Sequence, residues 1–279
     1  MSIKDFIDKS VIALHSLYPL EEARNIVTLL LCSRLGLKQW ELVLRYPLQM
    51  PIPLDDDMKR LLKGEPIQYV LGWSEFYGRR YRVDSSVLIP RPETEQMVDM
   101  ALKLDSSKHS RVLDLCTGSG VIAWTMALER SDFEVVAVDI STDALKVAES
   151  QFIVEHTPKF MQGDVLNESF MRGLGKYDLL LSNPPYIMES EKSFMRANVL
   201  NYEPSIALFV GDDDPLVFYK AIARCSRFLL KNGGEGIVEI NESLGEQTAE
   251  VFVKEGLKNV SIIKDYYAKM RFVTFKNAS

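Results

Sequence analysis

The chain has 279 residues, 47% hydrophobic and 26% charged, a composition typical of a globular protein with a substantial core. Its formal net charge of −6 argues against a protein that lives on nucleic acid, where a basic surface is expected. The three cysteines, Cys32, Cys116 and Cys225, have no paired spacing, which favours a reducing compartment. The apolar run "IVTLLLC" is too short to cross a bilayer, so we expect a cytoplasmic protein without a membrane partner.

Residues 1–72 predict a small helical domain. The segment "EEARNIVTLLLCSRLG" begins with acidic residues suited to a helix N-terminus and ends at Gly36, which suits a C-terminal stop. Shorter helical segments end at Pro47 and Gly64, and a last one begins after Pro66. No strand pattern interrupts them.

Residues 73–90 predict a β-hairpin that links this domain to the next. The segment "SEFYGRRYRVD" alternates in polarity and has a glycine at its centre. It carries Arg79, Arg80 and Arg82, which could form either a solvated face or a contact patch for an anionic partner.

Residues 91–279 predict a second domain of the α/β class, because strand and helix patterns alternate from Arg111 onward. The last two strand segments are too close together for a crossover helix, so they must be antiparallel. We therefore expect a doubly wound, mainly parallel, seven-stranded sheet with one reversed strand. The expected strands cover residues 111–116, 134–140, 159–164, 177–182, 235–240, 260–267 and 270–276, and the helices cover 120–130, 141–152, 215–234 and 242–256.

A glycine-rich turn, "CTGSG", joins the first strand to its helix. Gly118 and Gly120 would let the backbone approach a ligand, although a tight strand-to-helix turn is the alternative interpretation. Asp139 ends the next strand, where a carboxylate can accept hydrogen bonds from both ribose hydroxyls. Asp164 and Val165 end the third strand, where an adenine ring could rest. S-adenosylmethionine fits these three places, and NAD fits less well because the loop is short.

The motif "NPPY", residues 183–186, ends the apolar fourth strand. If the first and fourth strands are neighbours, Asn183 lies beside the glycine loop. Pro184 and Pro185 would hold the turn rigid. The Asn183 side chain and the Pro184 carbonyl offer two acceptors for one –NH₂ group, and Tyr186 offers a face for stacking. The motif therefore predicts methyl transfer to a planar amide or arylamine nitrogen, with no metal ion. A surface turn is the alternative, but it does not explain why the motif ends an apolar strand.

Four segments together resemble the HemK/PrmC protein-(glutamine-N5) methyltransferases of peptide chain release factors. They are "NPPYI", "DLCTGSG", "LIPRPETE" (residues 88–95) and "GEPIQYVLGWSEFYG" (residues 64–78). "NPPY" alone is shared with adenine-N6 DNA methyltransferases, whereas "PRPETE" before the glycine loop is far more specific.

The resemblance implies methylation of the glutamine amide in the Gly-Gly-Gln motif of class 1 release factors, with S-adenosyl-L-methionine as cofactor. It places catalysis at Asn183, Pro184, Pro185 and Tyr186. It places cofactor contacts at Cys116, Thr117, Gly118, Ser119, Gly120, Asp139, Asp164, Val165 and Asn183. The family usually has glycine where Cys116 stands, a change that is tolerable if φ is negative there. A relative can have tryptophan where Val165 stands, so contact with adenine would be apolar here.

Two other functions remain as alternatives. An adenine-N6 DNA methyltransferase would need a basic surface and a recognition domain to extrude its base. A protein that only holds S-adenosylmethionine would not need an intact "NPPY". We expect a monomeric enzyme without stable DNA binding, in which residues 1–72 recognise the release factor.

Overall fold

The computed structural model describes residues 1–104 and 109–277, and the chain divides into two compact units. Unit 1 comprises Met1–Trp73 together with Arg196–Tyr202. Unit 2 comprises the rest of the described chain, from Ser74 to Met195 and from Glu203 onward. The short segment Arg196–Tyr202 lies inside the predicted 91–279 domain but packs with unit 1. In the described ranges, no helix is both long and apolar enough to cross a membrane.

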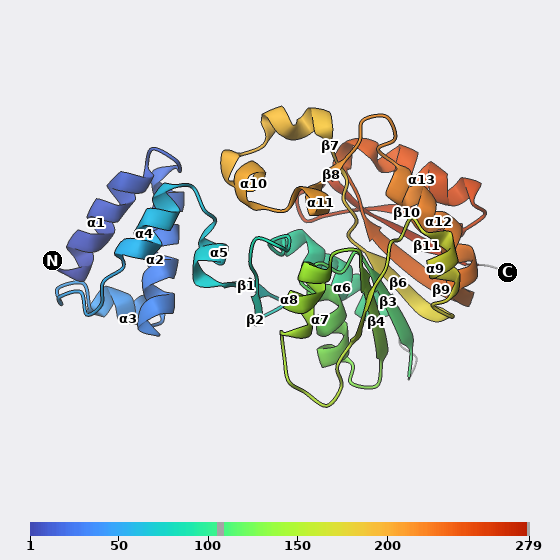
Figure 1. Cartoon of the computed structure of the whole chain (residues 1–279), viewed down its shortest axis with the longest axis horizontal. Coiled ribbons are helices and arrows are strands. Elements are labelled where there is room, and N and C mark those ends of the chain that lie inside the picture. The colour runs from blue at the N-terminus through green and yellow to red at the C-terminus, as the bar shows by residue number, and fades with distance from the viewer. Residues whose placement is uncertain (105–108, 278–279) are drawn as a thin grey trace. The chain divides into compact units, whose positions relative to one another are not determined.

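Unit 1 is helical, as expected (Figure 1). Its first helix was not identified from the sequence, although Ser2 and Asp5 form a capping box that starts it. The second helix ends at Gly36 in the left-handed conformation, as predicted. Near the last helix, Arg196 pairs with Glu22 at 2.7 Å. The helices are α1 (Ile3–Leu14), α2 (Leu20–Leu35), α3 (Gln39–Leu44), α4 (Asp55–Leu62), α5 (Ile67–Leu71) and α10 (Ala197–Tyr202).

Unit 2 contains a seven-stranded sheet, which confirms the predicted fold class (Figure 1). Its strands are β3 (Arg111–Leu115), β4 (Glu134–Asp139), β5 (Lys159–Gln162), β6 (Tyr177–Ser182), β9 (Leu230–Glu239), β10 (Lys258–Lys264) and β11 (Met270–Lys276). Their order is β10-β11-β9-β6-β3-β4-β5, and β11 runs antiparallel to both of its neighbours. Strands β3 and β6 pair in parallel, so the expected contact between the first and fourth strands is confirmed.

Helices cover both faces of this sheet, which explains why the central strands β3 and β6 bury apolar side chains on both faces. Along β3, Val112 packs on the side of α6 (Pro92–Leu104) and α7 (Val121–Glu129), and Leu113 packs on the side of α12 (Val217–Leu229) and α13 (Gly245–Lys254). Along β6, Leu179 packs on the side of α6 and α7, and Leu180 packs on the side of α12 and α13. The two remaining helices beside the sheet are α8 (Thr142–Glu149) and α9 (Glu168–Arg172).

Strand β9 begins earlier than expected, because the sequence predicts that residues 230–234 belong to the preceding helix and its glycine stop. Leu230 pairs with Tyr177, so the segment belongs to the sheet. A Cβ on Gly234 would lie 3.1 Å from the Asp178 carbonyl oxygen, so this glycine serves close strand packing.

Smaller elements complete the described chain. The predicted hairpin is present as β1 (Trp73–Phe76) and β2 (Arg79–Arg82), and Arg79 pairs with Glu129 at 2.7 Å. The segments after "NPPY" had no predicted structure. They form β7 (Ile187–Met188), η1 (Glu189–Phe194), α11 (Ser205–Leu208) and β8 (Phe209–Val210), and η2 (Glu242–Leu244) precedes α13.

Candidate functional site

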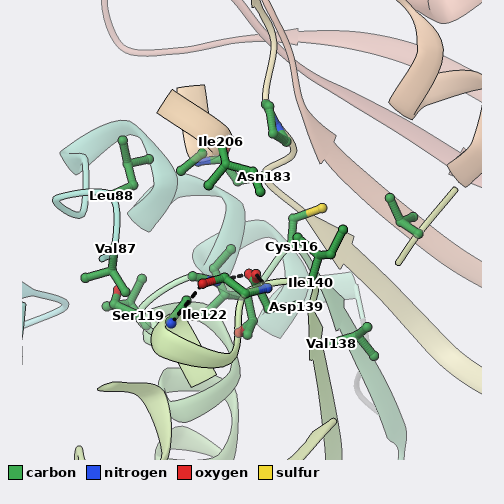
Figure 2. Close-up of a pocket in the computed structure, with 18 of the residues that line it drawn as sticks. Val87, Leu88, Cys116, Ser119, Ile122, Val138, Asp139, Ile140, Asn183 and Ile206 are labelled. Atoms are coloured by element: carbon green, nitrogen blue, oxygen red, sulfur yellow. Dashed lines mark hydrogen bonds between the residues drawn. The ribbon is translucent and has the colours of Figure 1, made fainter. Parts of the chain in front are cut away.

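A pocket lies at the carboxyl ends of β3, β4, β5 and β6 (Figure 2). This is where a doubly wound sheet normally binds its ligand. The predicted residues that line the pocket are Cys116, Thr117, Gly118, Ser119, Asp139, Asp164, Val165, Asn183 and Pro185. The predicted residues Gly120, Pro184 and Tyr186 are not part of this lining.

Asp139 joins two backbone segments of the pocket. Its carboxylate accepts hydrogen bonds from the N–H of Gly118 at 2.8 Å and from the N–H of Ser141 at 2.9 Å. Burial raises the pKa of Asp139, and these backbone hydrogen bonds oppose the shift. Each carboxylate oxygen has a second lone pair, so the side chain can still accept hydrogen bonds from a ligand.

The two glycines of the loop differ in their surroundings. Gly118 has φ +54° and open space where a Cβ would stand, so its backbone can approach a ligand. Gly120 has φ +80°, and a Cβ there would lie 2.9 Å from the Cβ of Ala148. Glycine at position 120 is therefore explained by the close packing of α7 against α8.

Cys116 has φ +59°. From the sequence we expect cysteine to be tolerated in place of glycine if φ is negative here, and φ is positive. A side chain in this left-handed region costs about 1–2 kcal/mol, and glycine would avoid that cost. Burial raises the pKa of the Cys116 thiol, which keeps it neutral.

A buried acid lies in the strand that precedes the loop. Asp114 is fully buried in β3 and accepts a hydrogen bond from the Thr117 hydroxyl at 2.5 Å. Burial raises the pKa of Asp114 to about 7.

The segment "LIPRPETE" forms another wall of the pocket, to which it contributes Leu88, Pro90, Arg91 and Thr94. Buried Glu203 holds this wall, since it accepts hydrogen bonds from the Ile89 N–H at 3.2 Å and from Arg91 at 2.7 Å. Apolar side chains from α11 and α12 complete the lining with Ile206, Ala207 and Phe218.

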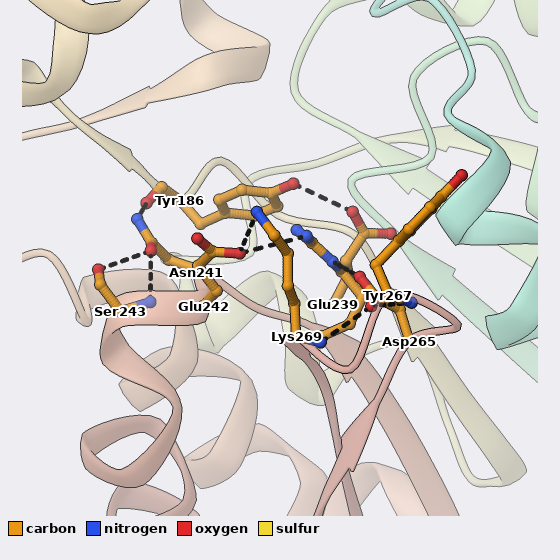
Figure 3. A network of polar contacts seen from close by, with 9 residues as sticks. Tyr186, Glu239, Asn241, Glu242, Ser243, Asp265, Tyr267 and Lys269 are labelled. Atoms are coloured by element: carbon orange, nitrogen blue, oxygen red, sulfur yellow. Dashed lines mark hydrogen bonds and ion pairs between the residues drawn. The ribbon is translucent and has the colours of Figure 1, made fainter.

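The "NPPY" turn is fixed at both ends. Asn183 directs Nδ2 toward the hydroxyl of Thr94 at 3.4 Å. Tyr186 donates its hydroxyl to Glu239 at 3.1 Å, and its backbone carbonyl accepts from Asn241 at 3.1 Å (Figure 3). Pro184 and Pro185 between these ends are buried. The rigid turn that the sequence predicts is therefore held in place by side chains from α6 and from the end of β9.

Sequence reasoning missed Thr94 and Glu239. Thr94 lies inside the "PRPETE" motif, which supports the family resemblance without indicating a role for this threonine. Glu239 ends an apolar strand, just as Asn183 follows one, so the strand-end rule could have found it. The sequence alone does not show that β9 pairs with β6, and this pairing places Glu239 beside the motif.

Comparisons with known proteins agree with this architecture. The family profile described as "Methyltransferase small domain" matches residues 97–202, and the "PrmC N-terminal domain" profile matches residues 12–72. The release factor glutamine methyltransferase of Bacteroides thetaiotaomicron is 39% identical over 267 residues, 94% of this chain and 95% of the relative. That of Flavobacterium psychrophilum is 34% identical over 282 residues, 98% of each chain. The crystal structure of a methyltransferase from Pyrococcus furiosus has 17% identity and a TM-score of 0.53, and the match covers 81% of this chain and 100% of that one; this likeness concerns the fold alone.

Proposed function

The chain belongs to the release factor glutamine methyltransferase family, and from this premise we propose the reaction that it catalyses. It methylates the side-chain amide nitrogen (N5) of the glutamine in the Gly-Gly-Gln motif of class 1 release factors. The methyl donor is S-adenosyl-L-methionine. The observation that carries the proposal is the placement of Asn183, whose amide nitrogen is turned to Thr94 while the residue lines the pocket.

The pocket fits the proposed cofactor. Asp139 presents a carboxylate that accepts backbone hydrogen bonds from Gly118 and Ser141, and its remaining lone pairs can accept hydrogen bonds from a ribose diol. Asp164 and buried Val165 would border the adenine, where the contact is apolar. When bound, the cofactor supplies an electrophilic methyl group on a sulfonium sulfur.

The protein groups then prepare the amide. An amide nitrogen is a poor nucleophile because its lone pair is delocalised. The Asn183 oxygen and the Pro184 carbonyl would accept its two hydrogens, favour the pyramidal nitrogen and stabilise the positive charge that develops there. Tyr186, half-buried and held by Glu239, would pack against the flat amide.

Adenine-N6 methylation of DNA is not favoured. The chain has a net charge of −6, and its N-terminal part matches the PrmC N-terminal domain. We further propose that this helical part recognises a second region of the release factor, because a lone glutamine side chain offers little specificity.

A labelling experiment tests the proposal. Purified protein is given S-adenosylmethionine with a labelled methyl group and either a class 1 release factor or duplex DNA. We expect label in the release factor only. A release factor whose motif glutamine is replaced by glutamate should stay unlabelled. Comparable labelling of DNA would favour the alternative.

A further inference from the structure

A buried carboxylate lies behind the "NPPY" turn. Glu239 ends β9, beside the end of β6, and its side chain is shielded from solvent. One carboxylate oxygen accepts the Tyr186 hydroxyl at 3.1 Å (Figure 3). The other accepts the Thr94 hydroxyl at 2.7 Å. Glu239 therefore contacts one end of the turn directly and reaches the other end through Thr94.

These hydrogen bonds have a fixed direction. An ionised carboxylate only accepts hydrogen bonds, so Thr94 must donate its single hydroxyl proton to Glu239. The Thr94 oxygen is then left with lone pairs, which can only accept. Asn183 must turn its NH₂ group toward that oxygen, at 3.4 Å, because its own carbonyl oxygen there would face lone pairs. The side-chain carbonyl oxygen of Asn183 therefore points away from Thr94.

We propose that Glu239 and Thr94 are positioning residues that set the orientation of the Asn183 side-chain amide for methyl transfer. The inference rests on the proposed function, in which the Asn183 oxygen accepts a hydrogen from the substrate amide. A reversed Asn183 would present an NH₂ group to the substrate NH₂ and lose that contact.

Burial and nearby charges act in opposite directions on the pKa of Glu239, and the net shift is upward. Burial raises its pKa, whereas the hydroxyls of Thr94 and Tyr186 and the positive charge of Arg271 lower it. Arg271 is itself held by Asp265 at 3.1 Å. The nearby negative charge of Glu93 acts in the opposite direction.

The test begins with substitutions that keep shape and change hydrogen bonding. Thr94→Val removes the hydroxyl, and we expect kcat on release factor to fall about tenfold, the effect of one lost hydrogen bond. Thr94→Ser keeps the hydroxyl and should restore most of that loss. Glu239→Gln places a donor in the network and should lower kcat by about ten- to a hundredfold. The dissociation constant of S-adenosylmethionine should change little in all three variants.

Thr248→Val is the matched control. Thr248 is a fully buried threonine in α13 whose hydroxyl has no hydrogen-bond partner in the described structure. The same change of side chain there should leave kcat unaltered.

A double-mutant cycle separates positioning from general support. If Thr94 acts through the orientation of Asn183, Thr94→Val should have little effect on kcat in an Asn183→Ala background. If the two losses multiply, the positioning role is wrong. Equal kcat for the wild type and Glu239→Gln would also overturn it. If Thr94→Val does not fold, the same cycle is measured with Glu239→Gln. A positioning role then predicts that Glu239→Gln has little effect on kcat in the Asn183→Ala background. A wild-type protein that leaves release factor unlabelled would instead refute the proposed function, and the inference would fall with it.

Discussion

Asp139 accepts the backbone N–H of Gly118 at 2.8 Å, so the end of β4 holds the glycine loop that follows β3. A second hydrogen bond, from the N–H of Ser141, fixes the same carboxylate from the start of α8. Asp139 therefore has two tasks in the proposed site. It would receive the ribose, and it keeps Gly118 in the conformation that leaves space for a ligand.

The first prediction concerns the loss of this carboxylate. Asp139→Ala should weaken S-adenosylmethionine binding about ten- to a hundredfold, because charge-assisted hydrogen bonds are worth roughly 1.5–3 kcal/mol. Calorimetry measures the affinity, and circular dichroism checks the fold. Asp143→Ala is the control, since this exposed carboxylate on α8 pairs with Lys146 at the surface. Unchanged affinity in Asp139→Ala would remove Asp139 from the cofactor site.

The second prediction concerns the catalytic amide. Asn183→Ala removes one of the two acceptors proposed for the substrate nitrogen, so kcat should fall by about 10²–10³. Steady-state kinetics on whole release factor measure the loss. Asn232→Ala is the control, because Asn232 is exposed and lies far from the motif in the sequence. Turnover near the wild-type rate would contradict the mechanism.

Buried Asp114 gives a prediction about pH. Its pKa in the folded protein is about 7, above the ordinary value of 3.8. A raised pKa means that the folded state binds the proton more tightly than the unfolded state. The resulting stabilisation is complete below pH of about 4 and is lost as the pH rises toward 7.

Asp114→Asn should remove this dependence, since the amide oxygen can still accept the Thr117 hydroxyl. We expect the melting temperature of the variant, relative to the wild type, to rise between pH 5 and pH 8. Thermal unfolding at several pH values measures the difference, in which effects of other titrating groups cancel. A constant difference would show that Asp114 does not titrate in this range.

Cys116 lines the pocket, yet its thiol should be inert. Only the thiolate reacts quickly with alkylating reagents, and burial raises the pKa of this thiol far above neutrality. Iodoacetamide at pH 7.5 should leave Cys116 unmodified in the folded protein and modify it in denaturant, as measured by peptide mass. Rapid modification of the native protein would reopen a nucleophilic role.

The sheet could be predicted because its strands carry local signals. Residues 111–115 and 177–182 are mainly apolar segments, and Asn183 follows the second segment directly. The parallel pairing of β3 with β6 then follows from the doubly wound pattern. Asp139 was found by the same rule.

The rest depends on contacts between residues far apart in the sequence. Glu239 meets Thr94 across 145 positions, and no local pattern indicates that pair. Glu203 reaches Arg91 across 112 positions, from a segment without a predicted element. The positive φ of Cys116 is a third case, because cysteine rarely adopts it and the sequence favours the opposite expectation.

The last prediction concerns unit 1. Removing residues 1–72 should leave S-adenosylmethionine binding largely intact, because all pocket residues belong to unit 2. Methylation of whole release factor should collapse, because contacts remote from the reacting amide supply specificity and orientation. A folded truncation that works at the full-length rate would refute the docking role, and an insoluble one would favour a structural role for unit 1.

Point variants in the full chain test the same docking role without a truncation. Helix α3 exposes Trp40 by 60% and Leu44 by 71%, and large exposed side chains of this kind often dominate protein interfaces. Trp40→Ala with Leu44→Ala should lower kcat/KM for whole release factor at least about tenfold, the effect of losing one interface hot spot. The slow methylation of a short Gly-Gly-Gln peptide should not change, since the peptide is too small to reach a second surface. Ile12→Ala, which alters a side chain 73% exposed on α1, is the matched control and should affect neither substrate. Equal losses on peptide and whole protein would mean that α3 acts on the catalytic unit and does not dock the release factor.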